Sequence, residues 1–205
     1  MGLSNFRCYR DSVTARQESP IGRRDRKRAV TRKAIADAAL RLFLERGYGN
    51  VTVREVADEA DVSATTLLNY FPTKEALVFD RDASMEASLV GAVTDRPGGT
   101  SALTALHQHL KQRVVRASEA SGAAQFRALV QSAASLVDYE RGMWLRHQDA
   151  LAAALAEATG LPTDDRSCRL VAAFALQTLI VAMGSEDPST VDLGFDLIES
   201  GWRAD

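Results

Sequence analysis

The chain has 205 residues, of which 46% are hydrophobic and 25% charged, a composition that excludes a wholly disordered chain and allows one large or two small domains. No uninterrupted apolar run approaches the roughly 20 residues of a membrane-spanning helix, so we expect a cytoplasmic protein without a membrane partner. The net charge of −2 conceals a division, because residues 1–33 carry ten basic and three acidic side chains whereas the remainder carries 15 and 24.

Residues 1–24 lack helical periodicity and contain Pro20 and Gly22, so we interpret them as a flexible basic leader. Positive charge at one end of an acidic body favours attraction to DNA phosphates. A solvated tail without a task is the alternative interpretation.

A first helix is predicted from about Arg26 or Thr31 to Arg46. Its apolar residues recur at the spacing of one helical face, which predicts a core helix. These residues are Ile35, Ala39, Leu42 and Phe43. Gly47 follows at the position where a left-handed residue commonly ends a helix.

Two short helices are predicted next, within a DNA-binding domain of residues 25–73. Thr52 and Glu55 have the spacing of a capping box, and Ser63 suits the cap of the second helix. Pro72 disfavours helix for the residue before it, so the second helix ends there. Two short helices joined by a tight turn form a helix-turn-helix, whose second helix enters the major groove of DNA.

The second helix has one side for the core and one for the bases. If Leu67 and Phe71 are buried, the opposite side is exposed. An asparagine suits adenine, a threonine suits several base edges, and apolar side chains suit the methyl group of thymine. The predicted reading side, next to the cap Ser63, holds Ala64, Thr65, Leu68 and Asn69.

Residues 62–77, VSATTLLNYFPTKEAL, resemble the DNA-binding domain of the TetR family of bacterial transcriptional regulators. The family pattern V-S-x-x-T-L-Y-x-Y-F-x-(S/T)-K-E-x-L is matched except at Leu68, where the family commonly has an aromatic residue. The resemblance implies phosphate contacts by Thr52, Tyr70 and Lys74, and it places Thr65 and Asn69 on the base-reading side. It also implies that the basic stretch before the first helix contacts phosphates or the minor groove, through Arg26, Lys27, Arg28 and Arg32.

Residues 74–205 are predicted to form a helical ligand-binding and dimerisation domain. Breaks rich in glycine and proline separate its helices, no alternating strand pattern occurs, and the whole chain is expected to be all-α with about nine helices. The expected ranges are 74–93, 101–118, 122–136, 138–159, 164–183 and 190–202.

The last two of these helices carry more apolar surface than the edge of one small domain can easily cover, which indicates a partner. The resemblance implies that they pair with their copies in a homodimer, so that two reading helices meet a palindromic operator. Closure of this surface within one chain is the alternative. The expected interface residues are Leu170, Val171, Phe174, Thr178, Phe195, Ile198 and Trp202.

The middle helices are expected to hold a small-molecule effector, because the resemblance implies a ligand site there and because adaptable and aromatic side chains gather on them. The structural alternative is that the same side chains are filled core. An apolar lining would favour a hydrophobic effector. The expected ligand-binding residues are Met85, Leu89, Leu106, His109, Phe126, Trp144, His147, Phe174 and Gln177.

These expectations combine into a ligand-responsive regulator, with repression favoured by the resemblance; the alternative is a helical DNA-binding scaffold without a ligand. No phosphate-binding glycine loop or nucleophile elbow occurs, so no enzyme and no cofactor is expected. His107 and His109 diverge on a helix, and Cys8 and Cys168 lack metal-ligand spacing, so no metal site is expected.

Overall fold

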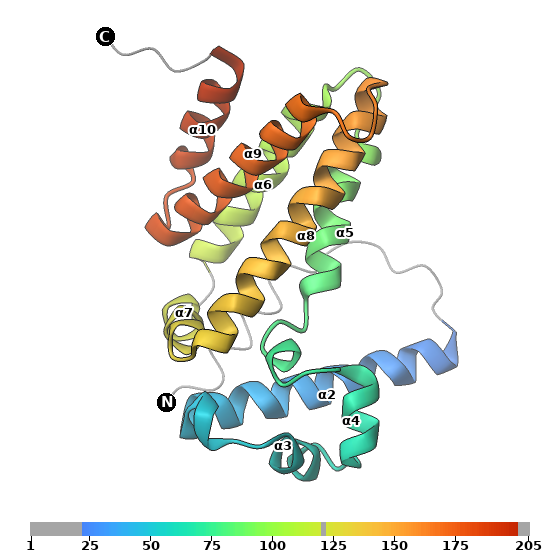
Figure 1. Cartoon of the computed structure of the whole chain (residues 1–205), viewed down its shortest axis with the longest axis vertical. Coiled ribbons are helices and arrows are strands. Elements are labelled where there is room, and N and C mark those ends of the chain that lie inside the picture. The colour runs from blue at the N-terminus through green and yellow to red at the C-terminus, as the bar shows by residue number, and fades with distance from the viewer. Residues whose placement is uncertain (1–21, 120–121, 201–205) are drawn as a thin grey trace. The chain divides into compact units, whose positions relative to one another are not determined.

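The computed structural model describes residues 22–119 and 122–200, which form nine α-helices and two short 3-10 helices and contain no strand (Figure 1). The prediction of an all-α fold is confirmed for these residues. In chain order the elements are α2 (Arg23–Arg46), η1 (Tyr48–Asn50), α3 (Val53–Glu59), α4 (Ala64–Tyr70), η2 (Glu75–Leu77), α5 (Asp82–Thr94), α6 (Ala102–Ser118), α7 (Ala123–Gln131), α8 (Ala134–Thr159), α9 (Arg166–Ser185) and α10 (Ser189–Ser200).

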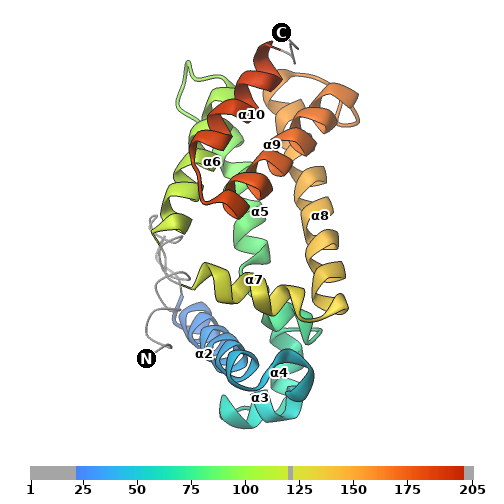
Figure 2. The ribbon, with the colours of Figure 1, turned by 90° about the vertical axis from the view of Figure 1, so that its left-hand side faces the viewer.

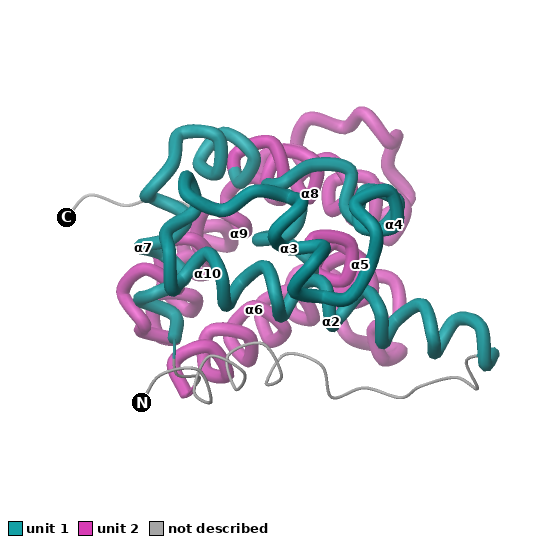
Figure 3. The backbone as a smooth tube through the Cα atoms, turned by 90° about the horizontal axis from the view of Figure 1, so that it is seen from below, with its two compact units in different colours: residues 1–4, 14–81, 122–140 teal, residues 5–13, 82–121, 141–205 magenta. Residues whose placement is uncertain are grey.

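The helices divide into two compact units (Figure 3). Within the described part of the chain, the first unit contains residues 22–81 and 122–140, and the second contains 82–119 and 141–200. Helix α8 contributes to both units, because the division falls between Glu140 and Arg141. Helix α7 and the first turns of α8 therefore belong with the helix-turn-helix.

The core of the first unit joins α2 to the helix-turn-helix. Phe43 on α2, Val56 on α3 and Leu67 on α4 are each 1% exposed or less. Burying a side chain of this size stabilises a fold by roughly 1.5 to 3 kcal/mol, so a few such residues provide most of the stability of this small module. Gly47 ends α2 with a positive φ of 83°, as predicted, and its N–H donates to the carbonyl of Phe43 at 2.9 Å.

An aromatic cluster fixes the later segment of the first unit. The ring of Phe79 stacks on that of Tyr139 with centroids 5.3 Å apart and meets Phe126 edge-on at 6.0 Å. Tyr139 lies in the first turns of α8 and Phe126 on α7. The cluster therefore ties both helices to the segment that follows the helix-turn-helix.

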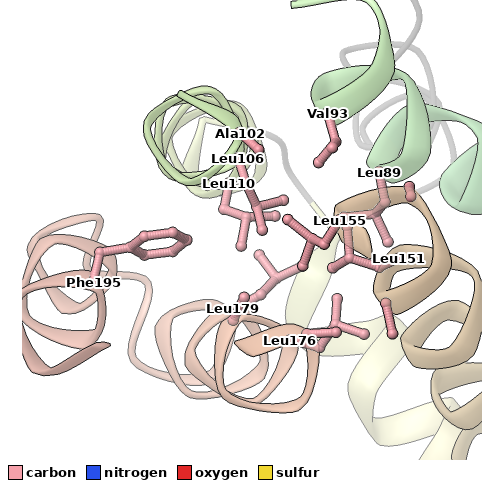
Figure 4. Packing of buried hydrophobic residues seen from close by; sticks show 14 of the residues in the cluster. Leu89, Val93, Ala102, Leu106, Leu110, Leu151, Leu155, Leu176, Leu179 and Phe195 are labelled. Atoms are coloured by element: carbon pink, nitrogen blue, oxygen red, sulfur yellow. The ribbon is translucent and has the colours of Figure 1, made fainter. Parts of the chain in front are cut away.

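The second unit is built from α5, α6, α9, α10 and the longer part of α8. Leucines from three helices, α6, α8 and α9, point toward one another in its core, and Phe195 of α10 adds its ring (Figure 4). Helix α9 packs against both α6 and α10 (Figures 1 and 2). Gly194 allows the close approach of α10, because a Cβ built there would lie 2.3 Å from the Thr178 methyl group.

Two predicted helices are interrupted. The helix expected over 74–93 is η2 followed by α5, which begins at Asp82. The carbonyl of Asp80, which a continuous helix would commit to a later backbone N–H, accepts instead from Arg32 at 3.0 Å. The helix expected over 122–136 ends at Gln131, where the Ser132 hydroxyl donates to the Leu129 carbonyl at 2.6 Å and competes with the helical pattern.

By its length and composition alone, helix α9 could cross a membrane. The sequence did not suggest this, because it contains no uninterrupted apolar run of that length. The buried core helix of a soluble protein meets the same criterion. Six of its side chains are buried in the described part of the chain, including Leu176 and Leu179, which belong to the core of the second unit. Its hydrophobicity is thus partly explained by packing within the unit.

Candidate functional site

A capping box closes the first turn of α3, as predicted. The Thr52 hydroxyl accepts a hydrogen bond from the Glu55 N–H at 3.2 Å, and the Glu55 carboxylate accepts from the Thr52 N–H at 2.7 Å. The Thr52 hydroxyl also donates to that carboxylate at 2.8 Å. The two hydrogen bonds that Thr52 donates to the carboxylate lower the pKa of Glu55, and the bond from the Thr52 N–H has the larger effect. The hydroxyl of Thr52 thus serves the helix start, and its contact with phosphate stays a prediction.

Helix α4 places the predicted reading residues on one exposed side. The Ser63 hydroxyl caps the helix by accepting from the Thr66 N–H at 3.0 Å. Leu67 and Phe71 are 0% exposed and fix the inward side of the helix. The outward side holds Ala64, Thr65, Leu68 and Asn69, all of them exposed. This arrangement is the one required for base contacts in a major groove, and those contacts stay a prediction.

The guanidinium group of Arg32 has partners within the first unit, and its predicted phosphate contact stays a prediction. It donates to the carbonyl of Tyr70 at 2.8 Å and to that of Asp80 at 3.0 Å. Its planar group also lies over the ring of Phe71, 4.2 Å from the centroid. Arg32 therefore fastens the end of α4 and the segment before α5 to α2.

Lys74 is likewise engaged within the fold, and its predicted phosphate contact stays a prediction. Its ammonium group donates to the Tyr48 carbonyl at 2.5 Å and lies over the ring of Tyr48, 4.0 Å from the centroid. Burial lowers the pKa of Lys74. The Tyr48 hydroxyl donates to Glu75 at 2.9 Å. Burial raises the pKa of Tyr48, and this hydrogen bond raises it further. The cluster joins η1 to η2.

The basic residues before the module are helical rather than extended. Helix α2 begins at Arg23, with Asp25 in its first turn, where an acidic side chain favours a helix start. The guanidinium group of Arg28 lies 5.9 Å from the ring centroid of Tyr70, so both belong to one surface. Sequence reasoning missed this helical start, although Asp25 was its signal. The exposed basic side chains are Arg23, Arg24, Arg26, Lys27 and Arg28.

The predicted ligand-binding residues are not all brought together. Met85, Leu89 and Leu106 are buried in the core of the second unit, which supports the alternative that they are core. Phe126 belongs to the first unit. Phe174 and Gln177 are exposed on α9. The periodicity of apolar residues cannot separate filled core from the wall of a ligand site, because both lie on the inner side of a helix.

His147, however, occupies a distinctive position in the second unit. It is 0% exposed, and its Nε2 lies 2.7 Å from Oδ1 of Asp82, the first residue of α5. Arg146 donates to the other oxygen of Asp82 at 2.7 Å. The partly exposed Trp144 meets the imidazole edge-on at 5.4 Å between centroids. Nδ1 of His147 is buried without a hydrogen-bond partner among the described residues.

The third histidine of the prediction, His109, lies on α6 of the same unit. Its Nε2 is 3.1 Å from the hydroxyl of Ser88 on α5. His109 is partly buried. Of the three polar residues predicted to bind the ligand, His109 and His147 therefore contact α5, whereas Gln177 is exposed on α9.

The predicted dimer residues differ in how exposed they are. Leu170 and Phe174 are exposed by 58% and 59%, whereas Val171, Thr178 and Ile198 are partly buried. Trp202 lies outside the described residues. Further exposed apolar side chains lie on α9 and α10 and were omitted from the predicted interface residues. They include Val181 on α9 and Leu193 and Leu197 on α10.

Phe195 is corrected, because its ring is 1% exposed inside its own chain and offers no surface to a second one. It stacks on the imidazole of His107, with centroids 4.6 Å apart and an angle of 11° between the rings. His107 and Lys111 of α6 also bind the carboxylate of Asp192 on α10, at 2.8 and 2.7 Å. The inner side of α10 is therefore held by α6 and α9, whereas Leu193 and Leu197 on its outer side are exposed.

The sequence of residues 35–80 matches the pattern of a family described as bacterial regulatory proteins, tetR family. The transcriptional regulator TcmR of Streptomyces glaucescens is 32% identical over 85 residues, 42% of this chain and 38% of TcmR. The repressor KstR of Mycobacterium tuberculosis is 43% identical over 65 residues, 32% of this chain and 29% of KstR. The alignments thus span less than two fifths of these relatives.

The fold is shared over a longer stretch. The crystal structure of Thermus thermophilus FadR, a TetR-family transcriptional repressor in complex with lauroyl-CoA, superposes with a TM-score of 0.57 at 20% identity. The superposition covers 85% of this chain and 96% of that one. The complex of SmeT with triclosan superposes with a TM-score of 0.56 at 16% identity, covering 86% and 93%. These likenesses concern the fold.

Proposed function

We propose that this chain, a member of the TetR family of bacterial regulatory proteins, is a transcriptional repressor that binds a palindromic operator as a homodimer. In this proposal a small, largely apolar effector binds the second unit and releases the DNA. The protein acts in the cytoplasm, where both operator and effector are found.

The observation that carries the proposal is the orientation of α4. With Leu67 and Phe71 buried, the exposed residues Thr65 and Asn69 are those whose polar groups suit base edges. The exposed basic start of α2 supplies positive charge on the same unit, which favours phosphate contacts and a salt-dependent affinity. Arg32 and Lys74 hold the module together, and their phosphate contacts stay predictions.

The homodimer is supported by the apolar side chains that α9 and α10 expose. Phe174 on α9 is 59% exposed and Leu193 on α10 is 61% exposed, although both helices bury their other sides in the second unit. Exposed apolar side chains gathered on adjacent helices are typical of an interface. A two-fold pairing would give two reading helices, whose spacing of about 34 Å matches one turn of DNA.

The effector is supported by polar groups within the second unit, at His147 beside Asp82 and at His109 beside Ser88, in a unit whose core is apolar. FadR and SmeT, which share the fold, are seen with lauroyl-CoA and triclosan. An effector that prefers one dimer geometry by about 3 kcal/mol would weaken operator binding by about a hundredfold through linkage.

The proposal is tested by selecting duplexes that bind the purified protein from a random pool and sequencing them. We expect enrichment of an inverted repeat and two protein chains on each enriched duplex, measured by light scattering. Enrichment of an asymmetric single site, or binding that is equal for all duplexes, would contradict the proposal. A protein that binds the repeat but whose affinity no small molecule changes would be the DNA-binding scaffold instead.

A further inference from the structure

The imidazole of His147 has one satisfied and one unsatisfied nitrogen. Nε2 faces Oδ1 of Asp82 at 2.7 Å, while Arg146 donates to the second carboxylate oxygen at 2.7 Å. An ionised carboxylate accepts only, so the imidazole tautomer that satisfies this contact is the one with its proton on Nε2. This tautomer leaves Nδ1 with a lone pair, and that atom is buried without a donor among the described residues.

A buried acceptor without a donor is unfavourable, and nearly all such groups in proteins find a partner. The orientation of the ring is fixed by Asp82, so rotation of the ring would give up the bond at Nε2 in order to satisfy Nδ1. A molecule that brings a hydroxyl or N–H group to Nδ1 would remove this penalty. The preorganised acceptor therefore selects a ligand with a hydrogen-bond donor.

The surroundings of the ring indicate what the rest of such a molecule is like. Met143 and Leu151, one turn before and after His147 on α8, are buried, and so is Met85, one turn after Asp82 on α5. Trp144 presents a partly exposed aromatic ring beside the imidazole. Apolar side chains with one placed polar atom are typical of sites for small apolar ligands.

We propose that Nδ1 of His147 is the polar recognition point of the effector and accepts a hydrogen bond from the hydroxyl group of a small, otherwise apolar molecule. The inference rests on the proposed effector response and names the chemistry of that effector. DNA binding does not depend on it, because His147 and its partners lie in the second unit.

The test uses the full-length protein with ¹⁵N-labelled histidine, since the chain has three histidines and their signals are few. The probes are para-alkylphenols from ethyl to octyl, each paired with the para-alkylanisole of equal chain length. An anisole keeps the apolar body and the oxygen but has no donor. We expect phenols to shift the Nδ1 signal of His147 and to bind about tenfold more tightly than their anisoles in calorimetry.

His147→Gln separates recognition from the contact with Asp82. The glutamine amide can donate to Asp82 as Nε2 does, but it provides no acceptor at the position of Nδ1. We expect phenol affinity to fall about tenfold and anisole affinity to stay unchanged. His107→Gln is the matched control, because His107 also meets a carboxylate through Nε2 but lies away from this ring, beside Phe195.

Several results would overturn the inference. A free-protein spectrum in which Nδ1 carries a proton would do so before any probe is added. Equal binding of phenols and anisoles, undiminished phenol binding to His147→Gln, or no binding of any phenol would do so as well. Operator binding is measured on the same samples: if it persists while the phenols fail, only the inference fails, and if it is absent too, the proposed function fails.

Discussion

At the scale of the residue, Arg32 shows that a basic side chain in a DNA-binding module can serve the fold. We expect Arg32→Lys to lower the free energy of unfolding by about 1 to 3 kcal/mol, because one ammonium group cannot bond two carbonyls and stack on Phe71 at once. Urea denaturation measures the change. Arg26→Lys is the control, since Arg26 is exposed, and it should leave stability unchanged. Equal stability of both variants would show that the clamp is unimportant.

Asn69 is the residue whose removal best tests base reading. Asn69→Ala should relax the preference at one position in each half-site by about 1 to 3 kcal/mol, because a bidentate base contact is lost. Affinities for a set of duplexes, each with one base pair changed, measure the effect. Asn50→Ala is the control, because Asn50 is exposed but lies outside the proposed reading side and donates to the Arg46 carbonyl. A loss of affinity that is uniform over all duplexes would assign Asn69 to phosphate.

Sequence reasoning at this scale succeeded where local geometry decides. The spacing of Leu67 and Phe71 sets which side of α4 is exposed, so the exposure of that side was predictable. The roles of Arg32 and Lys74 were not, because their partners lie 26 to 48 residues away in the chain. The sequence alone does not distinguish a basic side chain that binds a phosphate from one that bonds a backbone carbonyl, because the difference lies in tertiary contacts.

At the scale of the element, the contact between α9 and α10 depends on the absence of a side chain. Gly194→Ala should destabilise the protein by about 1 to 3 kcal/mol, because its Cβ would lie 2.3 Å from the methyl group of Thr178. Gly184→Ala is the matched control: its Cβ would meet nothing within 4 Å inside α9, so a gain of up to about 1 kcal/mol is expected. Thermal unfolding distinguishes them, and a tolerated Gly194→Ala would mean that α10 is loosely packed.

Helix ends were predictable where residues near the end determine it, and were not predictable where a residue distant in sequence does. Gly47 and the caps Thr52 and Ser63 carry their signals in the sequence. The start of α5 at Asp82 does not, because a guanidinium group from α2 takes the Asp80 carbonyl. Propensity alone would continue that helix, and a tertiary hydrogen bond overrides it.

At the scale of the whole molecule, the proposed homodimer is tested by substituting Leu170, with Leu145 as the control of similar exposure. Leu170→Glu should convert the dimer to monomer in sedimentation experiments, because a charge buried in an apolar interface without a partner is costly. Leu145→Glu makes the same change at nearly equal exposure, 56% against 58%, but on α8, and should leave the dimer intact. If both variants remain dimeric, the exposed sides of α9 and α10 are not the interface.

The fold class was predictable because helical periodicity runs through the described chain, whereas the grouping of its helices was not. Residues 122–140 follow α6 in sequence yet pack with the helix-turn-helix, through the ring of Phe79. Aromatic residues indicate burial but not the segment against which they are buried.

Helix α8 continues from one unit into the other without an end. Tyr139 stacks on Phe79 within the first unit, and His147, about 12 Å farther along the helix axis, bonds Asp82 within the second. The backbone hydrogen bonds of a single helix therefore run through the division between Glu140 and Arg141. A substitution that interrupts α8 at this point would affect residues of both units.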